Sequence, residues 1–175
     1  MYIEEVKGFY SISPLKLFRK TEGVVFDLVP EGIVKSTSSV DRVIHKNNAV
    51  SPGKVGEVER PWYMHYHQKD NLVVMHGYRR VELYSGELGR KLTFEIHPDK
   101  IYRDGELIAS EGVVLSWDVK IFHRIVSGEN GSASLNFAIR DEGFDIKTNF
   151  NIYDLNEETG EYTVVREGFK DQFKI

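Results

Sequence analysis

Short runs of β-branched and aromatic residues follow one another through most of the chain, with turn-forming residues between them and little helical periodicity. Such runs are typical of strands, and their close spacing is typical of an antiparallel sandwich or barrel. We therefore predict an all-β fold with strands at residues 23–29, 62–67, 71–84, 91–97, 105–109, 112–117, 121–126, 133–140 and 161–165.

Two dipeptides carry the strongest hairpin signals, Asp104-Gly105 and Asn130-Gly131. Each joins a residue that tolerates positive φ to a glycine, as a type I′ turn requires. We expect each of them to reverse the chain between two strands.

Two segments interrupt this rhythm. Residues 35–60 are polar and rich in turn formers, which predicts a long loop or mobile flap near an opening. Residues 154–175 predict either a last strand followed by a short helix or a docking tail. The helix is suggested by Phe169 and Phe173, which lie four positions apart and would share one helical face.

Composition narrows the classes of partner. The chain has 175 residues, enough for one domain with a sizeable core. Its net charge of -4 gives no electrostatic reason to expect nucleic acid or an anionic membrane as a partner. The absence of cysteine excludes disulfides and thiolate metal ligands. The N-terminus does not look like a signal peptide, and no apolar run approaches the ~20 residues of a membrane span. We predict a single cytoplasmic domain over residues 1–175.

Two of the six histidines stand one residue apart, His65 and His67, in a segment predicted to be a strand. Alternate side chains of a strand share a face, so both rings are expected on one side together with Tyr63. Two neutral imidazoles on one face suit a shared metal ion. The alternative is that both histidines simply lie on a solvated face.

A second segment adds to this pair. Gly112 and His123 frame the pattern G-x5-D-x-K-x2-H, and Gly77 ends the run that follows His65 and His67. Together these segments resemble the two motifs of the cupin superfamily, a Gly-x5-His-x-His pattern closed by Glu and Gly, and a later Gly followed by Pro, Gly, His and Asn. The chain departs from the family pattern at Glu59, Asp118, Lys120 and Ser127.

The resemblance implies the cupin double-stranded β-helix, a jelly-roll barrel, with its core at about residues 60–140. Cupins bind one divalent metal through two histidines, a glutamate and a last histidine, which carries over to His65, His67 and His123. The glutamate position falls on Asp70 or Asn71, depending on the direction of counting. We prefer Asp70, because a carboxylate suits a divalent cation better than an amide. Such ligands accept Zn, Fe, Mn, Ni or Cu ions.

Two further residues are candidates for catalysis near this metal. His76 shares the barrel-facing side with Asp70 if the strand alternation runs unbroken, and could then act as an acid or base. Otherwise it only ends the strand before Gly77. Tyr63 would place a phenol beside the metal, whereas Trp117 is predicted to belong to the core.

Three functions stay open for a barrel of this kind. The first is a metal-dependent enzyme, such as an oxygenase or isomerase, acting on a small molecule. The second is a metal-free sugar-nucleotide epimerase or isomerase, because residues 64–68 (MHYHQ) are similar to the dTDP-4-keto-sugar epimerases, with His65 in the place of the base. The third is a non-catalytic barrel that binds a small-molecule ligand. A homodimer is expected in each case, because edge strands of such barrels often pair between subunits.

Overall fold

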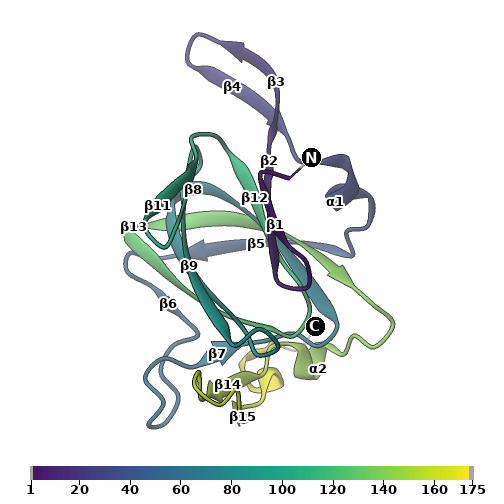
Figure 1. Cartoon of the computed structure of the whole chain (residues 1–175), viewed down its shortest axis with the longest axis vertical. Helices are drawn as coiled ribbons and strands as arrows, with labels where there is room; N and C mark the ends of the chain where they lie inside the picture. Colours follow the sequence, from purple (N-terminus) through teal and green to yellow (C-terminus); the bar gives the residue numbers. More distant parts are fainter. Residues whose placement is uncertain (1, 174–175) are drawn as a thin grey trace.

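Two long strands organise the molecule, which is described here by a computed structural model covering residues 2–173. Strand β8 (Gln68–Ser85) and strand β13 (Ile121–Arg140) run antiparallel and pair over most of their length (Figure 1). Within the described chain, five strands pair directly with these two and six more extend the sheet from those five, which gives one 13-stranded sheet. The predicted all-β fold is confirmed.

The sheet bends into two layers because each long strand contributes one half to each layer. The first layer holds the first half of β8, the second half of β13, and the strands β1 (Glu4–Val6), β2 (Tyr10–Pro14), β12 (Val113–Trp117) and β5 (Ser39–His45). The second layer holds the other halves, with β9 (Arg90–Ile96), β10 (Ile101–Arg103), β11 (Glu106–Ala109), β6 (Val50–Ser51) and β7 (Trp62–Tyr63). The sheet therefore includes strands outside residues 60–140.

The bend occurs where two glycines face each other, Gly77 on β8 and Gly131 on β13, with φ of 65° and 70°. A Cβ atom on Gly77 would lie 2.1 Å from the carbonyl oxygen of Gly131, so only glycine fits there. The register of β13 against β8 shifts at this point, between Ser127 and Ser132. The hairpin predicted at Asn130-Gly131 is therefore wrong, because the positive φ serves a bulge inside one continuous strand.

The hairpin predicted at Asp104-Gly105 is confirmed. Both residues have positive φ, 49° and 86°, and they connect β10 to β11 with Arg103 opposite Glu106. A two-residue loop with this backbone is the type I′ turn that the sequence favours.

The loop predicted for residues 35–60 is only partly present. Residues Ser39–His45 form β5, which pairs with β13 along its whole length. A short helix, α1 (Glu31–Lys35), precedes this strand. Periodicity did not reveal β5 because its outward side chains are the apolar Val40 and Ile44, while its inward ones include Asp41.

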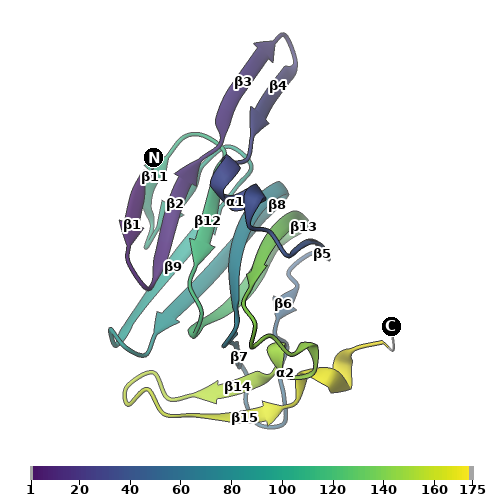
Figure 2. The same ribbon diagram turned by 90° about the vertical axis from the view of Figure 1, so that its right-hand side faces the viewer.

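The end of the chain crosses one end of the barrel (Figure 2). It contains α2 (Ile146–Asn149), β14 (Ile152–Leu155), β15 (Tyr162–Arg166) and the 3-10 helix η1 (Gly168–Asp171). The predicted strand and short helix are thus found, but Phe169 and Phe173 are exposed and form no packed helical face. Residues 174 and 175 lie outside the described part of the chain.

The main core lies between the two layers and consists of aliphatic and aromatic side chains from β2, β8, β9, β10, β12 and β13. A second buried cluster lies where β14 meets the barrel; it comprises Trp62, Met64, Tyr84, Phe122, Tyr153 and Leu155. No helix among the described residues is long and apolar enough to cross a membrane.

One element stands apart from the barrel. Strands β3 (Lys16–Thr21) and β4 (Val24–Leu28) form a separate two-stranded sheet that projects from one end of the molecule (Figures 1 and 2).

Candidate functional site

Three buried polar side chains converge inside the barrel: His65, Asp70 and His123. Each residue contributes one atom that could bind a metal, and these three atoms lie within 4.8 Å of one another. The Nε2 atom of His65 is 3.3 Å from Oδ2 of Asp70, and the Nε2 atom of His123 is 3.9 Å from the same oxygen. We call this group the His–Asp–His cluster.

The barrel itself brings these residues together. Asp70 lies on β8 in the first layer, and His123 lies on β13 in the second layer, opposite Leu83. His65 belongs to the irregular segment between β7 and β8, and its carbonyl accepts a hydrogen bond from the backbone N–H of Lys120 at 2.7 Å. Residues distant along the chain therefore meet only because the sheet closes on itself.

Backbone carbonyls set the orientation of both imidazole rings. Nδ1 of His65 contacts the carbonyl oxygen of Asn149, and Nδ1 of His123 lies 3.2 Å from the carbonyl oxygen of Ile121. A carbonyl only accepts hydrogen bonds, so each Nδ1 carries the proton and donates it. Each Nε2 atom is then directed at Asp70, as in metal centres where a second partner holds the histidine.

The carboxylate of Asp70 is held by two amides on its other side. Its Oδ1 atom accepts hydrogen bonds from Nε2 of Gln68 at 2.8 Å and from Nδ2 of Asn136 at 2.7 Å. Complete burial alone would raise the pKa of Asp70, but attraction and hydrogen bonding from His65, with help from His123 and Asn136, hold it well below its usual range. Asp70 is therefore an anion inside the barrel.

His123 has the opposite tendency. Burial and repulsion from the neighbouring His65 lower the pKa of His123 to about 4, against a smaller opposing effect of Asp70. At neutral pH His123 is an uncharged imidazole with a lone pair on Nε2. Such a nitrogen can accept a proton or bind a metal ion.

The donor set of the cluster fits a divalent transition metal. Two imidazole nitrogens and one carboxylate oxygen are the usual three protein ligands of a catalytic zinc or iron centre. Ligands at ~2.0–2.1 Å from a tetrahedral metal lie about 3.4 Å apart, and the contacts of Asp70 with His65 and His123 are 3.3 and 3.9 Å. The three ligand atoms lie within 4.8 Å of one another, so His123 would have to move closer to both partners to complete this geometry.

The structure places His67 away from the cluster. The shared face predicted for His65 and His67 is wrong, because β7 ends at Tyr63 and β8 begins only at Gln68, so strand alternation does not apply between them. The half-exposed His67 instead contacts Oδ1 of Asp141 through Nδ1 at 2.8 Å. Its ring lies so close to Gly143 that an added Cβ would be 2.4 Å away.

Two other candidates also lie elsewhere. His76 is exposed, because the pairing of β8 with β13 shifts between Ala133 and Ser134 and ends the alternation that would have directed it inward. Asn71 points to the opposite face from Asp70, and its Nδ2 donates to the carbonyl of Phe137 at 2.7 Å. Of the two residues considered for the glutamate position, only Asp70 reaches the cluster.

Tyr63 lies beside the cluster on β7, directly opposite His123 on β13. The ring centroids of Tyr63 and His123 are 5.9 Å apart. Burial raises the pKa of Tyr63, only partly opposed by a hydrogen bond with Ser51, so the phenol keeps its proton at neutral pH. The residue thus remains a candidate proton donor near the cluster.

Trp117 is part of the core, as the sequence suggested, but it also borders the cluster. It lies opposite Asp70 on the neighbouring strand, and its ring centroid is 5.1 Å from that of His123. Its indole N–H is buried and has no hydrogen-bond partner among residues 2–173. A buried donor without a partner is costly, and a ligand oxygen in the barrel would satisfy it.

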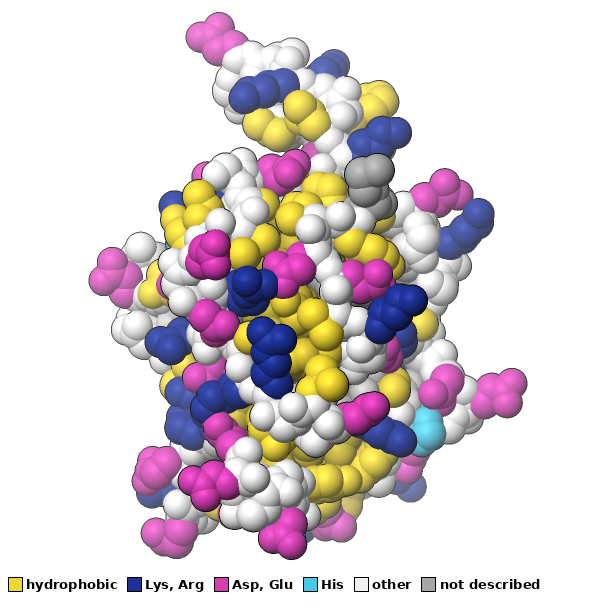
Figure 3. Space-filling view, in the orientation of Figure 1, with side chains coloured by type: hydrophobic (Ala, Val, Ile, Leu, Met, Phe, Trp, Pro, Cys, Tyr) yellow, Lys and Arg dark blue, Asp and Glu magenta, His cyan; other side chains and the backbone are white. Residues whose placement is uncertain are grey.

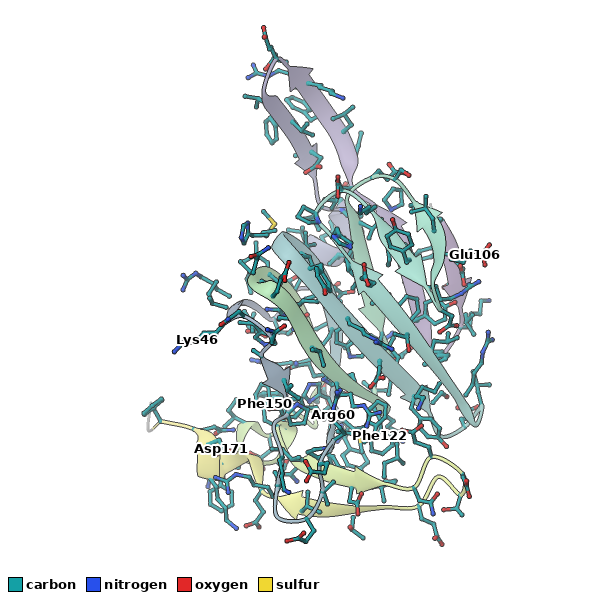
Figure 4. All side chains as sticks on the ribbon, turned by 90° about the vertical axis from the view of Figure 1, so that its left-hand side faces the viewer. Lys46, Arg60, Glu106, Phe122, Phe150 and Asp171 are labelled. Carbon is teal, nitrogen blue, oxygen red and sulfur yellow. The ribbon has the colours of Figure 1, made fainter. Side chains whose placement is uncertain are left out.

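Sequence reasoning also missed the segment that covers the cluster. Asn149, at the end of α2, binds His65 through its carbonyl, and its side chain donates to Gln68 at 3.1 Å. Phe150 packs edge-on against His65 with ring centroids 5.4 Å apart, and Figure 4 shows it at the end of the barrel beside β14 and β15. No motif links these positions to residues more than eighty places earlier, so only the folded chain reveals them.

Comparisons with known proteins place the fold. No protein-family model and no curated protein matches the sequence. A dTDP sugar isomerase from Desulfovibrio desulfuricans G20 has a similar structure, with a TM-score of 0.57 and 14% identity over 79% of this chain and 82% of that one. The sugar 3,4-ketoisomerase QdtA from Thermoanaerobacterium thermosaccharolyticum, solved with TDP, gives 0.53 and 12% over 81% and 85%.

At these identities the likeness concerns the fold alone. The chain folds as an all-β barrel that shares its fold with these two sugar isomerases.

Proposed function

We propose that this barrel binds a nucleotide-linked keto sugar and moves a proton from the carbon beside the carbonyl to the carbonyl carbon, as a 3,4-ketoisomerase does. The observation that carries the proposal is the His–Asp–His cluster buried inside the barrel. The same fold occurs in two sugar isomerases, one of them solved with TDP, which supports this ligand class.

The reaction requires groups that this cluster can supply. A base removes the proton from a carbon beside the carbonyl, and the bonding electrons move onto the carbonyl oxygen to give an enediolate. The hydroxyl group on the deprotonated carbon then passes its proton to the former carbonyl oxygen. Proton return to the former carbonyl carbon completes the shift of the carbonyl, with no net oxidation and no co-reactant. Catalysis therefore needs a neutral base, a proton donor and a hydrogen-bond donor for the oxygen.

His123 is the best placed base. Its pKa of about 4 keeps it neutral, and its Nε2 lies 3.9 Å from Asp70, beyond hydrogen-bonding distance, so the lone pair is free. In His65, by contrast, both ring nitrogens face protein oxygens. When His123 takes up a proton, the anionic Asp70 beside it stabilises the imidazolium, as the carboxylate of a catalytic triad does.

Two neighbours of His123 complete the set. The unpartnered indole N–H of Trp117 would donate to the carbonyl oxygen, where negative charge develops during the reaction. The phenol of Tyr63, which stays protonated because burial raises its pKa, would return the proton to the sugar. Both side chains pack next to the ring of the proposed base.

Substrate entry requires the covering segment to move. The exposed fractions of His65, Asp70 and His123 are 4%, 2% and 5%, so a sugar cannot reach them while residues 141–151 stay in place. The contact of His67 with Asp141 then fastens this cover at its first residue. Loops that close over a site commonly exclude water from the reaction.

The test is proton exchange in heavy water. With a dTDP-linked 4-keto-6-deoxy sugar, we expect the enzyme to introduce deuterium beside the carbonyl and to form the 3-keto isomer, both followed by NMR. His123→Gln should remove exchange and isomerisation, whereas His76→Gln, at an exposed position, should retain both. No exchange with the wild-type protein at millimolar sugar nucleotide would contradict the proposal.

The second candidate is a metal-dependent barrel enzyme, and the convergence of two Nε2 atoms on Asp70 favours it. His65, His123 and Asp70 would hold the ion, which would supply Lewis-acid chemistry. Elemental analysis of protein purified without chelator tests this, with His123→Gln as the comparison. One bound metal per wild-type chain that is lost in the variant supports a metal-dependent enzyme. Less than a tenth of an equivalent of metal in the wild type refutes it.

A further inference from the structure

The side chain of Gln68 joins two parts of the structure that the proposed reaction needs together. It is 1% exposed at the start of β8, and its Nε2 donates to Oδ1 of Asp70 at 2.8 Å. Its Oε1 accepts hydrogen bonds from Nε of Arg140 at 3.0 Å and from Nδ2 of Asn149 at 3.1 Å. An inverted amide would set its own N–H groups against these two donors, so the amide has one orientation.

The acceptor side of this amide is tied to the covering segment, residues 141–151. Arg140 immediately precedes the segment, and its guanidinium carbon lies 4.1 Å from the ring centroid of Phe144. Asn149 is the only buried residue of the segment, whose other residues are exposed or half-buried. Figure 3 shows acidic side chains projecting into solvent from the loop that leads to α2. Polar contacts at Asn149, more than apolar burial, therefore hold the segment on the barrel.

Opening this segment would change both residues that orient Asp70. When Asn149 leaves, Gln68 loses one of the two hydrogen bonds that fix its amide, and His65 loses the carbonyl that accepts from Nδ1. An amide with fewer partners samples more rotamers, so its hydrogen bond to Asp70 weakens. The carboxylate is then held less well beside His123.

We propose that Gln68 is a positioning residue, which makes the alignment of Asp70 with the base His123 depend on closure of residues 141–151 over the substrate. This inference rests on the proposed function, since it concerns the same site. In the closed state Asp70 stabilises the imidazolium that forms when His123 takes up the proton. In the open state the base lacks this support, so proton removal is restricted to an enclosed sugar, as in other induced-fit enzymes.

Positioning of Asp70 differs chemically from simple attachment of the covering segment. Attachment needs only the acceptor Oε1 of Gln68, whereas positioning needs the N–H donor at Nε2. Glutamate offers oxygen on both sides, so Gln68→Glu keeps the attachment and loses the donor. Gln68→Met has a similar volume and no amide, so it loses both. The two variants therefore separate the two roles.

The first experiment measures kcat and KM for the sugar nucleotide, together with the stoichiometry of TDP binding by calorimetry. Gln68→Glu should lower kcat by about 10–100-fold, the range for residues that orient the ligands of metal sites, and should keep the wild-type KM and TDP stoichiometry. The matched control is Gln172→Glu, because Gln172 also donates to the covering segment, at 2.7 Å to the carbonyl of Ile146. This control should keep the wild-type kcat. A wild-type kcat in Gln68→Glu would show that Gln68 only attaches the segment and would overturn the proposal.

Gln68→Met supplies a neutral variant in case the added carboxylate beside Asp70 prevents folding, which loss of TDP binding would reveal. It should also lower kcat, because the donor to Asp70 is absent. An unchanged kcat in this variant would overturn the proposal.

The second experiment needs no substrate and measures amide hydrogen exchange in residues 141–151. Because coupling is reciprocal, Asp70→Asn should speed exchange there in the wild-type background and have little effect in a Gln68→Met background, where the connection is already lost. Asp41→Asn, which alters another hydrogen bond of Asn136, should leave this exchange unchanged. Equal effects of Asp70→Asn in both backgrounds, or none in either, would overturn the coupling. Absence of isomerisation by the wild type would contradict only the proposed reaction, and the exchange result would still decide the coupling.

Discussion

Replacing Asp70 by Asn removes one buried charge while leaving the shape of the side chain nearly unchanged. The asparagine oxygen can still accept the hydrogen bonds that Gln68 and Asn136 give to Oδ1. Hydrogen bonds to a charged group contribute ~1.5–3 kcal/mol and neutral ones ~0.5–1.5 kcal/mol, so weakening two of them costs about 2–3 kcal/mol. The variant also loses the attraction between Asp70 and His65, but an amide is easier to bury than a carboxylate. The total loss in the free energy of unfolding is therefore about 2–4 kcal/mol.

The assay is urea unfolding at pH 7.5, with Asp41→Asn as the matched control. Asp41 belongs to the same hydrogen-bond network but is half-buried and reaches Asn136 only at 3.3 Å. Its substitution should cost less than about 1 kcal/mol, as for an ordinary polar contact near the surface. A change below about 0.5 kcal/mol for Asp70→Asn, or equal losses for both variants, would refute this account of the cluster.

The ionised state of Asp70 also predicts how the stability difference between wild type and Asp70→Asn changes with pH. Because the pKa of Asp70 lies below its usual range in the folded state, its charge stabilises the fold above the unfolded pKa of ~3.9 and loses this effect as pH falls through the lowered folded value. The difference between wild type and Asp70→Asn should therefore stay constant from pH 8 to pH 5 and shrink below about pH 4. A difference that grows towards acid would contradict the ionised state assigned to Asp70.

Three further changes test other parts of the structure. Gly77→Ala should lower the free energy of unfolding by about 3 kcal/mol or more, from a positive φ and a backbone clash, whereas Gly89→Ala, at positive φ in open space, should cost only about 1 kcal/mol in the same urea assay. The wild type should lose free energy of unfolding as pH falls from 6.5 to 4, because His123 binds a proton in the unfolded chain but not when buried with a pKa of about 4. His123→Gln should lose less over this window, measured by urea unfolding at pH 7 and 5. Gly143→Ala should displace the ring of His67 and speed amide hydrogen exchange in residues 141–151, while the barrel strands keep their protection.

The all-β fold could be predicted from the sequence, and so could three residues that meet inside the barrel, His65, Asp70 and His123. The resemblance to the cupin motifs brought Asp70 and His123 into one hypothesis, and the folded chain places them with His65 in one cluster. The fold could be predicted because short runs of β-branched and aromatic residues mark strands locally and because a barrel has few ways to close.

The failures share one cause, which is that a local signal has more than one structural use. In the Asn130-Gly131 pair, Gly131 supplies positive φ for a bulge in β13 as readily as it would for a hairpin. The shift beside His76 likewise reverses the side-chain direction without any marker residue. The segment at His65 and His67 resembles a strand in composition, yet the chain leaves the sheet there, so the two rings diverge. Only long-range pairing decides such cases.

The geometry of the cluster leaves one requirement that bears on the metal-dependent candidate. Nε2 of His65 and Oδ2 of Asp70 face each other at 3.3 Å, and two lone pairs at that distance need a positive charge between them. In the metal-dependent candidate the bound ion would meet this need, with the carboxylate of Asp70 as its charged ligand. Asp70→Asn replaces that carboxylate by a neutral amide, so calorimetric titration of Zn²⁺ should show binding at least about tenfold weaker than in the wild type. Equal affinity in the two proteins would show that Asp70 is no ligand and would remove the reason for grouping it with His65 in one metal site.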